Sequence, residues 1–126
     1  MILITGGRFQ GKKEYAEKAY PEHCRRWRDA ALVPWDELYE ASSILHLEEG
    51  IRKLLADNED PAEKTEELLD RNPEALICCA EVGCGVVPVE EELRRYRDAV
   101  GFACRRIASE ADEVVRLVCG IAQRIK

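Results

Sequence analysis

The sequence predicts an α/β fold in which helices cover both faces of a mostly parallel sheet, giving three layers. Short apolar runs alternate with helical patterns along the chain, which is typical of sheets built from strand–helix–strand units. The run "EALICCAEVG", residues 74–83, is a continuous apolar run too short for a helix, as expected for a strand buried on both faces. A glycine-rich segment separates the first apolar run from the first helical stretch. Ligands of such sheets bind at the carboxyl ends of the strands.

The first third of the chain predicts a strand, a loop and a helix. Residues 2–5, "ILIT", form a short β-branched run, and a helical stretch starts near Gly11 and is stopped by Pro21. Residues 24–31 are ambiguous between a loop and a second strand. Residues 34–40 begin with a proline, which suits the start of a helix of two turns.

The middle of the chain predicts two helices. In residues 44–58 apolar side chains recur every three or four positions, which indicates an amphipathic helix whose first turn could instead belong to a strand. A second helix follows in residues 60–73. Asp60 can cap its N-terminus, Pro61 fits the first helical position, and Glu63 completes a capping box.

The last third predicts a long helix and a strand. The helix covers residues 89–110, with apolar side chains at alternating spacings of three and four: Leu93, Tyr96, Val100, Ala103 and Ile107. The strand is "DEVVRLVCG", residues 112–120. No composition break marks a linker, so we expect residues 1–126 to form a single domain.

Composition and charge exclude several classes of protein. The 126 residues are 46% hydrophobic and 35% charged, which suits one domain with a real core. A net charge of −6 and a pI near 5.1 disfavour nucleic acid as a partner. No apolar stretch approaches the roughly 20 residues that span a bilayer, so we expect no membrane partner and a cytoplasmic location.

The cysteines are expected to be buried reduced thiols rather than disulfides or zinc ligands. The chain has no C-x-x-C pair and only two histidines that could complete a metal site. Several of the cysteines lie in or beside apolar runs. We therefore predict no metal site built from these six residues: Cys24, Cys78, Cys79, Cys84, Cys104 and Cys119.

The glycine-rich segment predicts a phosphate-binding loop. Gly6, Gly11 and Lys12 satisfy G-x-x-x-x-G-K directly after a strand and at the start of a helix, the context of the P-loop. Backbone N–H groups of such a loop turn towards the phosphates and the lysine reaches the outer ones. The fold is therefore predicted to be P-loop NTPase-like. The predicted phosphate-binding residues are Gly6, Gly7, Arg8, Phe9, Gln10, Gly11, Lys12 and Lys13.

Lys13 departs from the P-loop pattern, because the next position should be a serine or threonine whose hydroxyl ligates Mg²⁺. A charged lysine cannot ligate a metal ion. Two alternatives stay open. Either Lys13 turns away and Mg²⁺ is held through water, or its charge partly replaces the metal and the loop binds phosphate without efficient transfer.

A second constrained loop, "EVGCGVVP", residues 81–88, follows the predicted central strand. Glu81 is placed to hold Mg²⁺ through water or to orient a hydroxyl nucleophile, so Lys12 and Glu81 are the predicted catalytic residues. On spacing alone, a tight strand-to-helix connection with Glu81 bonded to backbone amides is equally consistent.

These segments together resemble a known family. "TGGRFQGKKEYAE" is similar to the motif T-G-G-x-x-x-G-K-S-x-x-A-E of the bifunctional adenosylcobinamide kinase / adenosylcobinamide-phosphate guanylyltransferase family of cobalamin biosynthesis. The last 46 residues resemble that family's C-terminal third, with its E-V-G-x-G-x-V-P, R-x-x-R-D-x-x-G and closing G-I-x-x-x-I-K patterns.

The resemblance implies a P-loop fold, GTP or ATP as the nucleotide and a cobinamide as acceptor substrate. It implies phosphorylation of the aminopropanol hydroxyl of cobinamide, then guanylyl transfer from GTP through a covalent histidine. It also implies self-association, since members of the family form oligomers. By matching position, the nucleotide pocket would be lined by Glu81, Val82, Gly83 and Gly85.

The family's histidine motif has no counterpart here. It resembles H-x-x-x-R-P-x-x-W, and nothing between Pro21 and Leu54 reproduces it. Of the two histidines, His46 lies among apolar residues and is better interpreted as structural than as a nucleophile, and His23 has less support. We therefore expect a nucleotide-binding relative with reduced activity and without histidine guanylylation. The alternative is a non-catalytic partner or scaffold in cobalamin synthesis.

Overall fold

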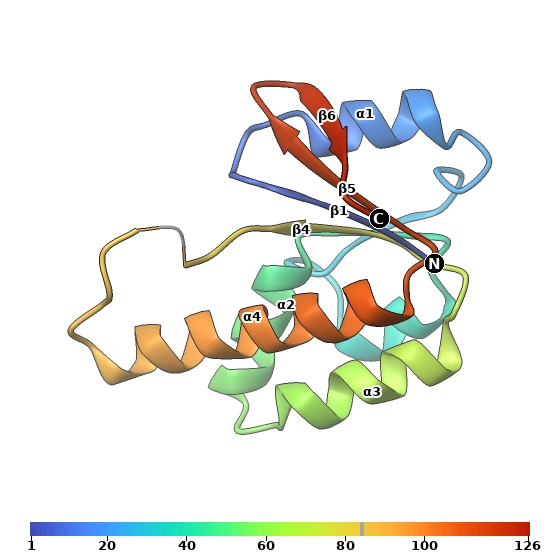
Figure 1. Ribbon diagram of the computed structural model, residues 1–126. Coiled ribbons are helices and arrows are strands. Elements are labelled where there is room, and N and C mark those ends of the chain that lie inside the picture. The colour runs from blue at the N-terminus through green and yellow to red at the C-terminus, as the bar shows by residue number, and fades with distance from the viewer. Residues whose placement is uncertain (84) are drawn as a thin grey trace.

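The computed structural model describes residues 1–83 and 85–126 and shows a six-stranded sheet with helices on both faces (Figure 1). The strand order is β2-β3-β4-β1-β5-β6, and neighbouring strands are parallel except for the antiparallel pair β5 and β6. The α/β fold with a mostly parallel sheet is thus confirmed. The strands are β1 (Ile2–Gly6), β2 (Trp27–Asp29), β3 (Ser43–Leu45), β4 (Leu76–Ala80), β5 (Glu113–Val118) and β6 (Ile121–Arg124).

The helices divide unequally between the two faces. Figure 1 shows α1 on one side of the sheet and α2, α3 and α4 on the other, which gives the predicted three layers. The larger hydrophobic core lies beneath α2, α3 and α4, and the smaller one lies beneath α1. The helices are α1 (Lys12–Ala19), the 3₁₀ helix η1 (Trp35–Glu40), α2 (Leu47–Ala56), α3 (Pro61–Arg71) and α4 (Glu91–Glu110).

Strand β4 lies at the centre of the fold, and all five of its residues are buried. Ile77 and Cys79 point into the larger core, while Leu76 and Cys78 point into the smaller one. This alternation explains the continuous apolar run, because a strand covered on both faces has no polar side.

The cap and the proline predicted for the start of α3 are confirmed. The Asp60 carboxylate accepts a hydrogen bond from the backbone N–H of Ala62 at 2.9 Å, and Pro61 occupies the first helical position. The buried Thr65 hydroxyl donates to the carbonyl of Pro61 at 2.7 Å. The first of these bonds satisfies a backbone N–H that the N-terminus of a helix otherwise leaves unpaired.

Several expectations are corrected. Residues 121–124 add a strand, β6, that the sequence did not predict. By contrast, residues 43–45 form strand β3 and α2 begins at Leu47, which confirms the alternative that the first turn of residues 44–58 belongs to a strand. Leu93 belongs to the apolar pattern of the predicted helix but is 43% exposed, because it lies in the first turn of α4, outside the core. Of the cysteines expected to be buried, Cys78 and Cys79 are buried, whereas Cys24 and Cys104 are partly buried. Cys119 is exposed in the turn between β5 and β6, and Cys84 lies outside the described residues. No helix among the described residues is long and apolar enough to cross a bilayer.

Candidate functional site

The glycine-rich loop connects β1 to α1 and lies at the carboxyl end of the sheet. Gly6 has φ +138°, and a Cβ there would lie 2.4 Å from the carbonyl oxygen of Leu117 on β5. Gly11 caps α1 with φ +83°. Both backbone conformations are strained for any residue with a side chain. The glycines of the predicted motif are therefore required by the local structure.

Lys12 is the first residue of α1, and its side chain folds back over the loop. Its ammonium donates to the carbonyl of Gly7 at 2.7 Å and to that of Gly6 at 3.2 Å. The positive charge thus lies against the loop, where the N-terminal end of α1 adds further positive potential.

The middle of the loop is tied to structure on both sides. The Arg8 guanidinium donates to the carboxylate of Glu49 on α2 at 2.5 Å. The Gln10 side-chain oxygen accepts from the backbone N–H of Cys119 at 2.5 Å. Between them Phe9 has φ 58° and is 99% exposed, so its ring projects into solvent beside the cleft.

Lys13 points away from the loop. Its ammonium lies 3.8 Å from the carboxylate of Glu17, one turn further along α1, and 6.0 Å from the centre of the Trp27 ring. This arrangement corresponds to the first of the two alternatives, in which Lys13 turns away. The hydroxyl that ligates Mg²⁺ in the P-loop pattern is nevertheless missing.

A cleft of about 480 Å³ opens beside the loop, at the carboxyl ends of β1, β2, β3 and β4. This is where an open parallel sheet binds its ligands. Its lining combines cationic, acidic, aromatic and small side chains from the loop, the ends of β2 and β4 and the start of α2: Arg8, Phe9, Lys12, Asp29, Ala31, His46, Glu48, Glu49, Arg52 and Ala80.

His46 and Asp29 form a pair in this cleft. His46 directly follows β3, and Asp29 is the last residue of the adjacent strand β2. The His46 Nδ1 lies 3.0 Å from Asp29 Oδ1. A carboxylate only accepts, so Nδ1 carries a proton, and in a neutral ring the lone pair would lie on Nε2. His46 is 50% exposed, with φ 52° at the N-cap of α2. The histidine interpreted as structural therefore faces the cleft that contains Lys12.

Two glutamates at the start of α2 also line the cleft, and they differ in environment. Glu48 is 2% exposed, and its Oε2 accepts from the backbone N–H of Ala80 at the end of β4, at 2.9 Å. Glu49 contacts Arg8 and also lies 3.6 Å from Arg52. Two arginines share this one carboxylate, so the trio carries one net positive charge. Over the whole lining, three cationic side chains face three acidic ones, so the positive charge is local to the trio and to Lys12.

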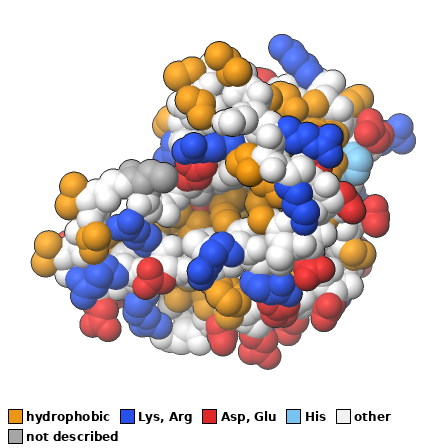
Figure 2. All heavy atoms as spheres, viewed as in Figure 1, with side chains coloured by type: hydrophobic (Ala, Val, Ile, Leu, Met, Phe, Trp, Pro, Cys, Tyr) orange, Lys and Arg blue, Asp and Glu red, His pale blue; other side chains and the backbone are white. Residues whose placement is uncertain are grey.

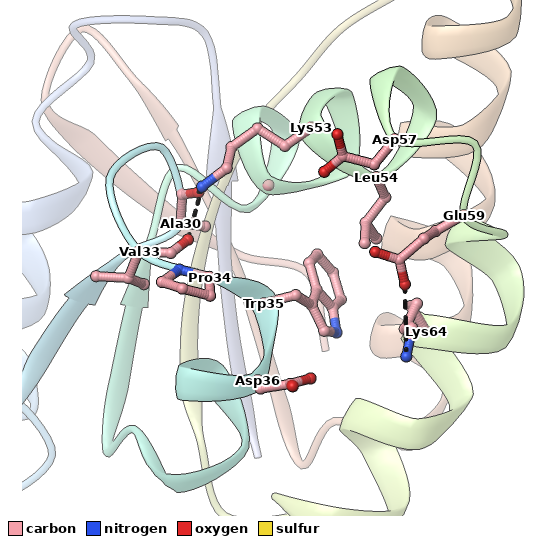
Figure 3. Close-up of a pocket in the computed structure, with 11 residues that line it drawn as sticks. Ala30, Val33, Pro34, Trp35, Asp36, Lys53, Leu54, Asp57, Glu59 and Lys64 are labelled. Atoms are coloured by element: carbon pink, nitrogen blue, oxygen red, sulfur yellow. Dashed lines mark hydrogen bonds and ion pairs between the residues drawn. The ribbon is translucent and has the colours of Figure 1, made fainter.

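The segment after Asp29 is fixed by α2. Lys53 donates to the carbonyls of Val33 at 2.6 Å and Ala30 at 3.2 Å, as Figure 3 shows. The figure also shows the Trp35 indole between this turn and α3, beside a second cavity of about 230 Å³. A Cβ at Gly50 of α2 would lie 3.2 Å from that ring, so the glycine allows the close packing. These contacts hold the end of β2, and with it Asp29, in place.

The predicted nucleotide-pocket residues lie outside the lining of the 480 Å³ cleft. Glu81 and Val82 line a separate apolar pocket beside α4. The Glu81 carboxylate accepts two bonds from the Arg116 guanidinium, at 2.8 and 3.0 Å. The carbonyl of Gly83 accepts from Arg97 at 2.5 Å, and a Cβ at Gly85 would meet no atom of the described residues within 4 Å. The catalytic role of Glu81 stays a prediction.

Most of the chain, from the start of β3 onwards, is similar to a known protein family. The sequence profile of the family "Cobinamide kinase / cobinamide phosphate guanyltransferase" matches residues 42–125, which is 84 of the 126 residues. The chain belongs to this family. A curated member, the "Bifunctional adenosylcobalamin biosynthesis protein CobU" of Salmonella typhimurium, is 46% identical over 51 residues. That match covers 40% of this chain and 28% of the relative's length.

The range that matches the family extends from β3 to β6, whereas the glycine-rich loop precedes it. The resemblance to the family is therefore confirmed, and the role of the loop rests on its motif and geometry. Within residues 1–83 and 85–126, no three histidine, cysteine or acidic side chains cluster to hold a metal ion.

Sequence reasoning missed the four charged cleft residues Asp29, Glu48, Glu49 and Arg52. Asp29 ends a strand of only three residues, too short to show periodicity. The others belong to the first two turns of an amphipathic helix, where charged side chains are ordinary. The available signal was positional, because polar residues directly after parallel strands converge at one edge of the sheet.

Proposed function

We propose that this chain binds a nucleoside triphosphate, GTP or ATP, in the cleft beside the glycine-rich loop and acts in cobalamin biosynthesis. The observation that carries the proposal is Lys12, whose ammonium lies 2.7 and 3.2 Å from two loop carbonyls at the N-terminus of α1. The cleft volume of about 480 Å³ lies within the roughly 300–1,000 Å³ common for small-ligand sites. The positive trio around Glu49 would stabilise phosphates at the mouth of the cleft.

The proposed chemistry is phosphoryl transfer from the nucleotide to a hydroxyl of a cobinamide-type alcohol, at a reduced rate. Lys12 would stabilise charge on the transferred phosphoryl group. His46 is oriented by Asp29, and its Nε2 would accept the proton of an acceptor hydroxyl when the ring is neutral. Glu81 could assist only if Arg116 shared its carboxylate with the substrate or a metal ion. Because the family's histidine motif has no counterpart, the proposal does not include guanylylation.

A non-catalytic nucleotide-binding partner is the second candidate, and Lys13 favours it. Without a hydroxyl at this position, Mg²⁺ would have to be held through water, and the Mg²⁺-assisted step of phosphoryl transfer would be weakened. The cleft carboxylates of Asp29 and Glu48 are oxygen ligands of the type that Mg²⁺ takes, although both already accept hydrogen bonds. Self-association stays a prediction.

Calorimetric titration with GTP and with ATP, each with and without Mg²⁺, tests the proposal. We expect micromolar binding by the native chain and a marked loss in Lys12→Ala. Lys18→Ala is the matched control, since Lys18 is an exposed lysine in the last turn of the same helix. Adding cobinamide and γ-labelled nucleotide then separates the candidates: labelled cobinamide supports transfer, and binding without transfer supports the partner. If neither GTP nor ATP produces any heat of binding, both candidate functions are overturned.

A further inference from the structure

Two cysteines far apart in the sequence bring their sulfur atoms together. Cys79 lies on β4 and Cys104 on α4, and their Sγ atoms are 3.5 Å apart across the interface between the strand and the helix. A disulfide bond is about 2.05 Å long, so the two sulfurs need to approach by only about 1.5 Å. The strand and helix thus already hold the pair close to bonding distance.

The two thiols differ in accessibility. Cys79 is fully buried. Cys104 is partly buried and lines an apolar pocket of about 310 Å³ between α4 and the sheet. Figure 2 shows a hollow with hydrophobic side chains above α4 on this face of the molecule. A Cβ at Gly101, one turn before Cys104, would meet no described atom within 4 Å, which keeps the pocket open. A small neutral molecule can therefore reach Cys104 without unfolding the core.

The contact between the thiols also makes them chemically unequal. When Cys104 is deprotonated, the Cys79 thiol can donate to its thiolate, which lowers the pKa of Cys104. The same contact, together with burial, raises the pKa of Cys79. The thiolate is the nucleophilic form of cysteine, so the more accessible member of the pair is also the more reactive one.

We propose that Cys79 and Cys104 form a redox-active dithiol, which hydrogen peroxide or a related peroxide oxidises to an intramolecular disulfide linking α4 to β4. The Cys104 thiolate attacks one peroxide oxygen; an S–O bond forms, the O–O bond breaks, and the leaving hydroxide takes up a proton. The product is a sulfenic acid. The Cys79 sulfur then attacks the Cys104 sulfur, releasing hydroxide, which takes the Cys79 proton to form water. In total two thiols lose two electrons and two protons, and the peroxide becomes two waters.

Cys78 provides a matched control within the same strand. It adjoins Cys79 but points into the smaller core on the other face of the sheet. Burial raises the pKa of its thiol to about 12, so it is a poor nucleophile at neutral pH. The proposal concerns the thiols alone and is independent of nucleotide binding.

The test is peroxide treatment of the folded full chain, followed by alkylation, trypsin digestion and mass spectrometry. Cys104 lies in the tryptic peptide 98–105, "DAVGFACR", and Cys79 in peptide 72–94. We expect the two peptides to become linked with the loss of two hydrogens, and dithiothreitol to reverse the link. Fragmentation should place the bond at Cys79. Before oxidation, a maleimide should label Cys104 at least about tenfold faster than Cys79.

The variants sharpen the result. Cys78→Ala should form the same link as the native chain, whereas Cys79→Ala and Cys104→Ala should not. If a variant fails to fold, the test depends on whether the two peptides of the native chain become linked. The proposal is overturned if peptide 98–105 stays unlinked after peroxide treatment of the native chain, with Cys104 either still alkylated or oxidised to a sulfinic acid. It is equally overturned if the link persists in folded Cys79→Ala.

Discussion

Replacing Lys12 by alanine should weaken the binding of GTP or ATP by roughly 30- to 150-fold. The ammonium donates to the carbonyls of Gly7 and Gly6 at 2.7 and 3.2 Å, so it already lies at the loop before a ligand arrives. A hydrogen bond to a charged group contributes about 1.5–3 kcal/mol. Because phosphate oxygens must replace or share the two carbonyl acceptors, we expect truncation to cost about 2–3 kcal/mol of binding free energy.

Isothermal titration calorimetry at one fixed salt concentration measures this effect, since interactions between charges weaken as salt is added. Thermal denaturation of Lys12→Ala shows whether the variant is folded. Lys18→Ala removes the same charge from the far end of α1 and should bind as the native chain does. A folded Lys12→Ala that binds within about threefold of the native chain would refute the reasoning that the loop and its lysine hold the phosphates.

Three further changes have defined outcomes. A Cβ at Gly50 would lie 2.9 Å from the nearest side-chain carbon, so Gly50→Ala should lower the free energy of unfolding by about 1–3 kcal/mol in urea denaturation. Gly101→Ala, in open space on α4, should instead leave it unchanged or raise it by up to about 1 kcal/mol, and equal losses in both would contradict the packing account. Lys13→Ser should make nucleotide affinity more dependent on Mg²⁺, because it restores the hydroxyl that ligates the metal in a P-loop. An unchanged dependence would show that Lys13 does not limit Mg²⁺ binding. The Arg106 guanidinium holds the pKa of Glu66 below its ordinary value, so the folded chain binds fewer protons there than the unfolded chain does. This contribution to stability is complete above about pH 4.5 and is lost as the pH falls through the folded-state pKa, so Glu66→Gln should show a smaller drop in melting temperature on acidification.

Local rules predicted the elements whose causes are local. The cap at Asp60 depends on residues that are neighbours in sequence, because its carboxylate accepts from the backbone N–H of Ala62 at 2.9 Å. The central strand was predicted from its unbroken apolar run, and residues 76–80 are all buried. The glycines of the loop were predicted from spacing, and Gly6 and Gly11 adopt the positive φ angles that such a turn demands.

Elements that depend on pairing were missed. The four residues of β6 are all exposed, so their sequence carries no burial pattern, and they become a strand only by pairing with β5. The turn between these strands contains Gly120, whose neighbour Cys119 adopts φ 50°, which a cysteine rarely does. The strand that follows this turn therefore had no local signal.

The cleft illustrates the same limit. His46 and Asp29 are 17 residues apart, and their contact exists because β2 and β3 are parallel neighbours. Glu48 is buried only because the end of β4 supplies the N–H that its carboxylate accepts. A sequence pattern could predict the loop that holds Lys12, but not which side chains would face it across the ends of three other strands.

The most direct test of the central claim is a ¹⁵N–¹H correlation spectrum of the chain titrated with GTP or ATP. If the glycine-rich loop holds the phosphates, the largest shifts will occur at the amides of residues 6–13, with smaller ones at Ala80 and the start of α2, which line the same cleft. Unperturbed loop amides at saturating nucleotide, or shifts confined to the apolar pocket beside α4, would contradict it.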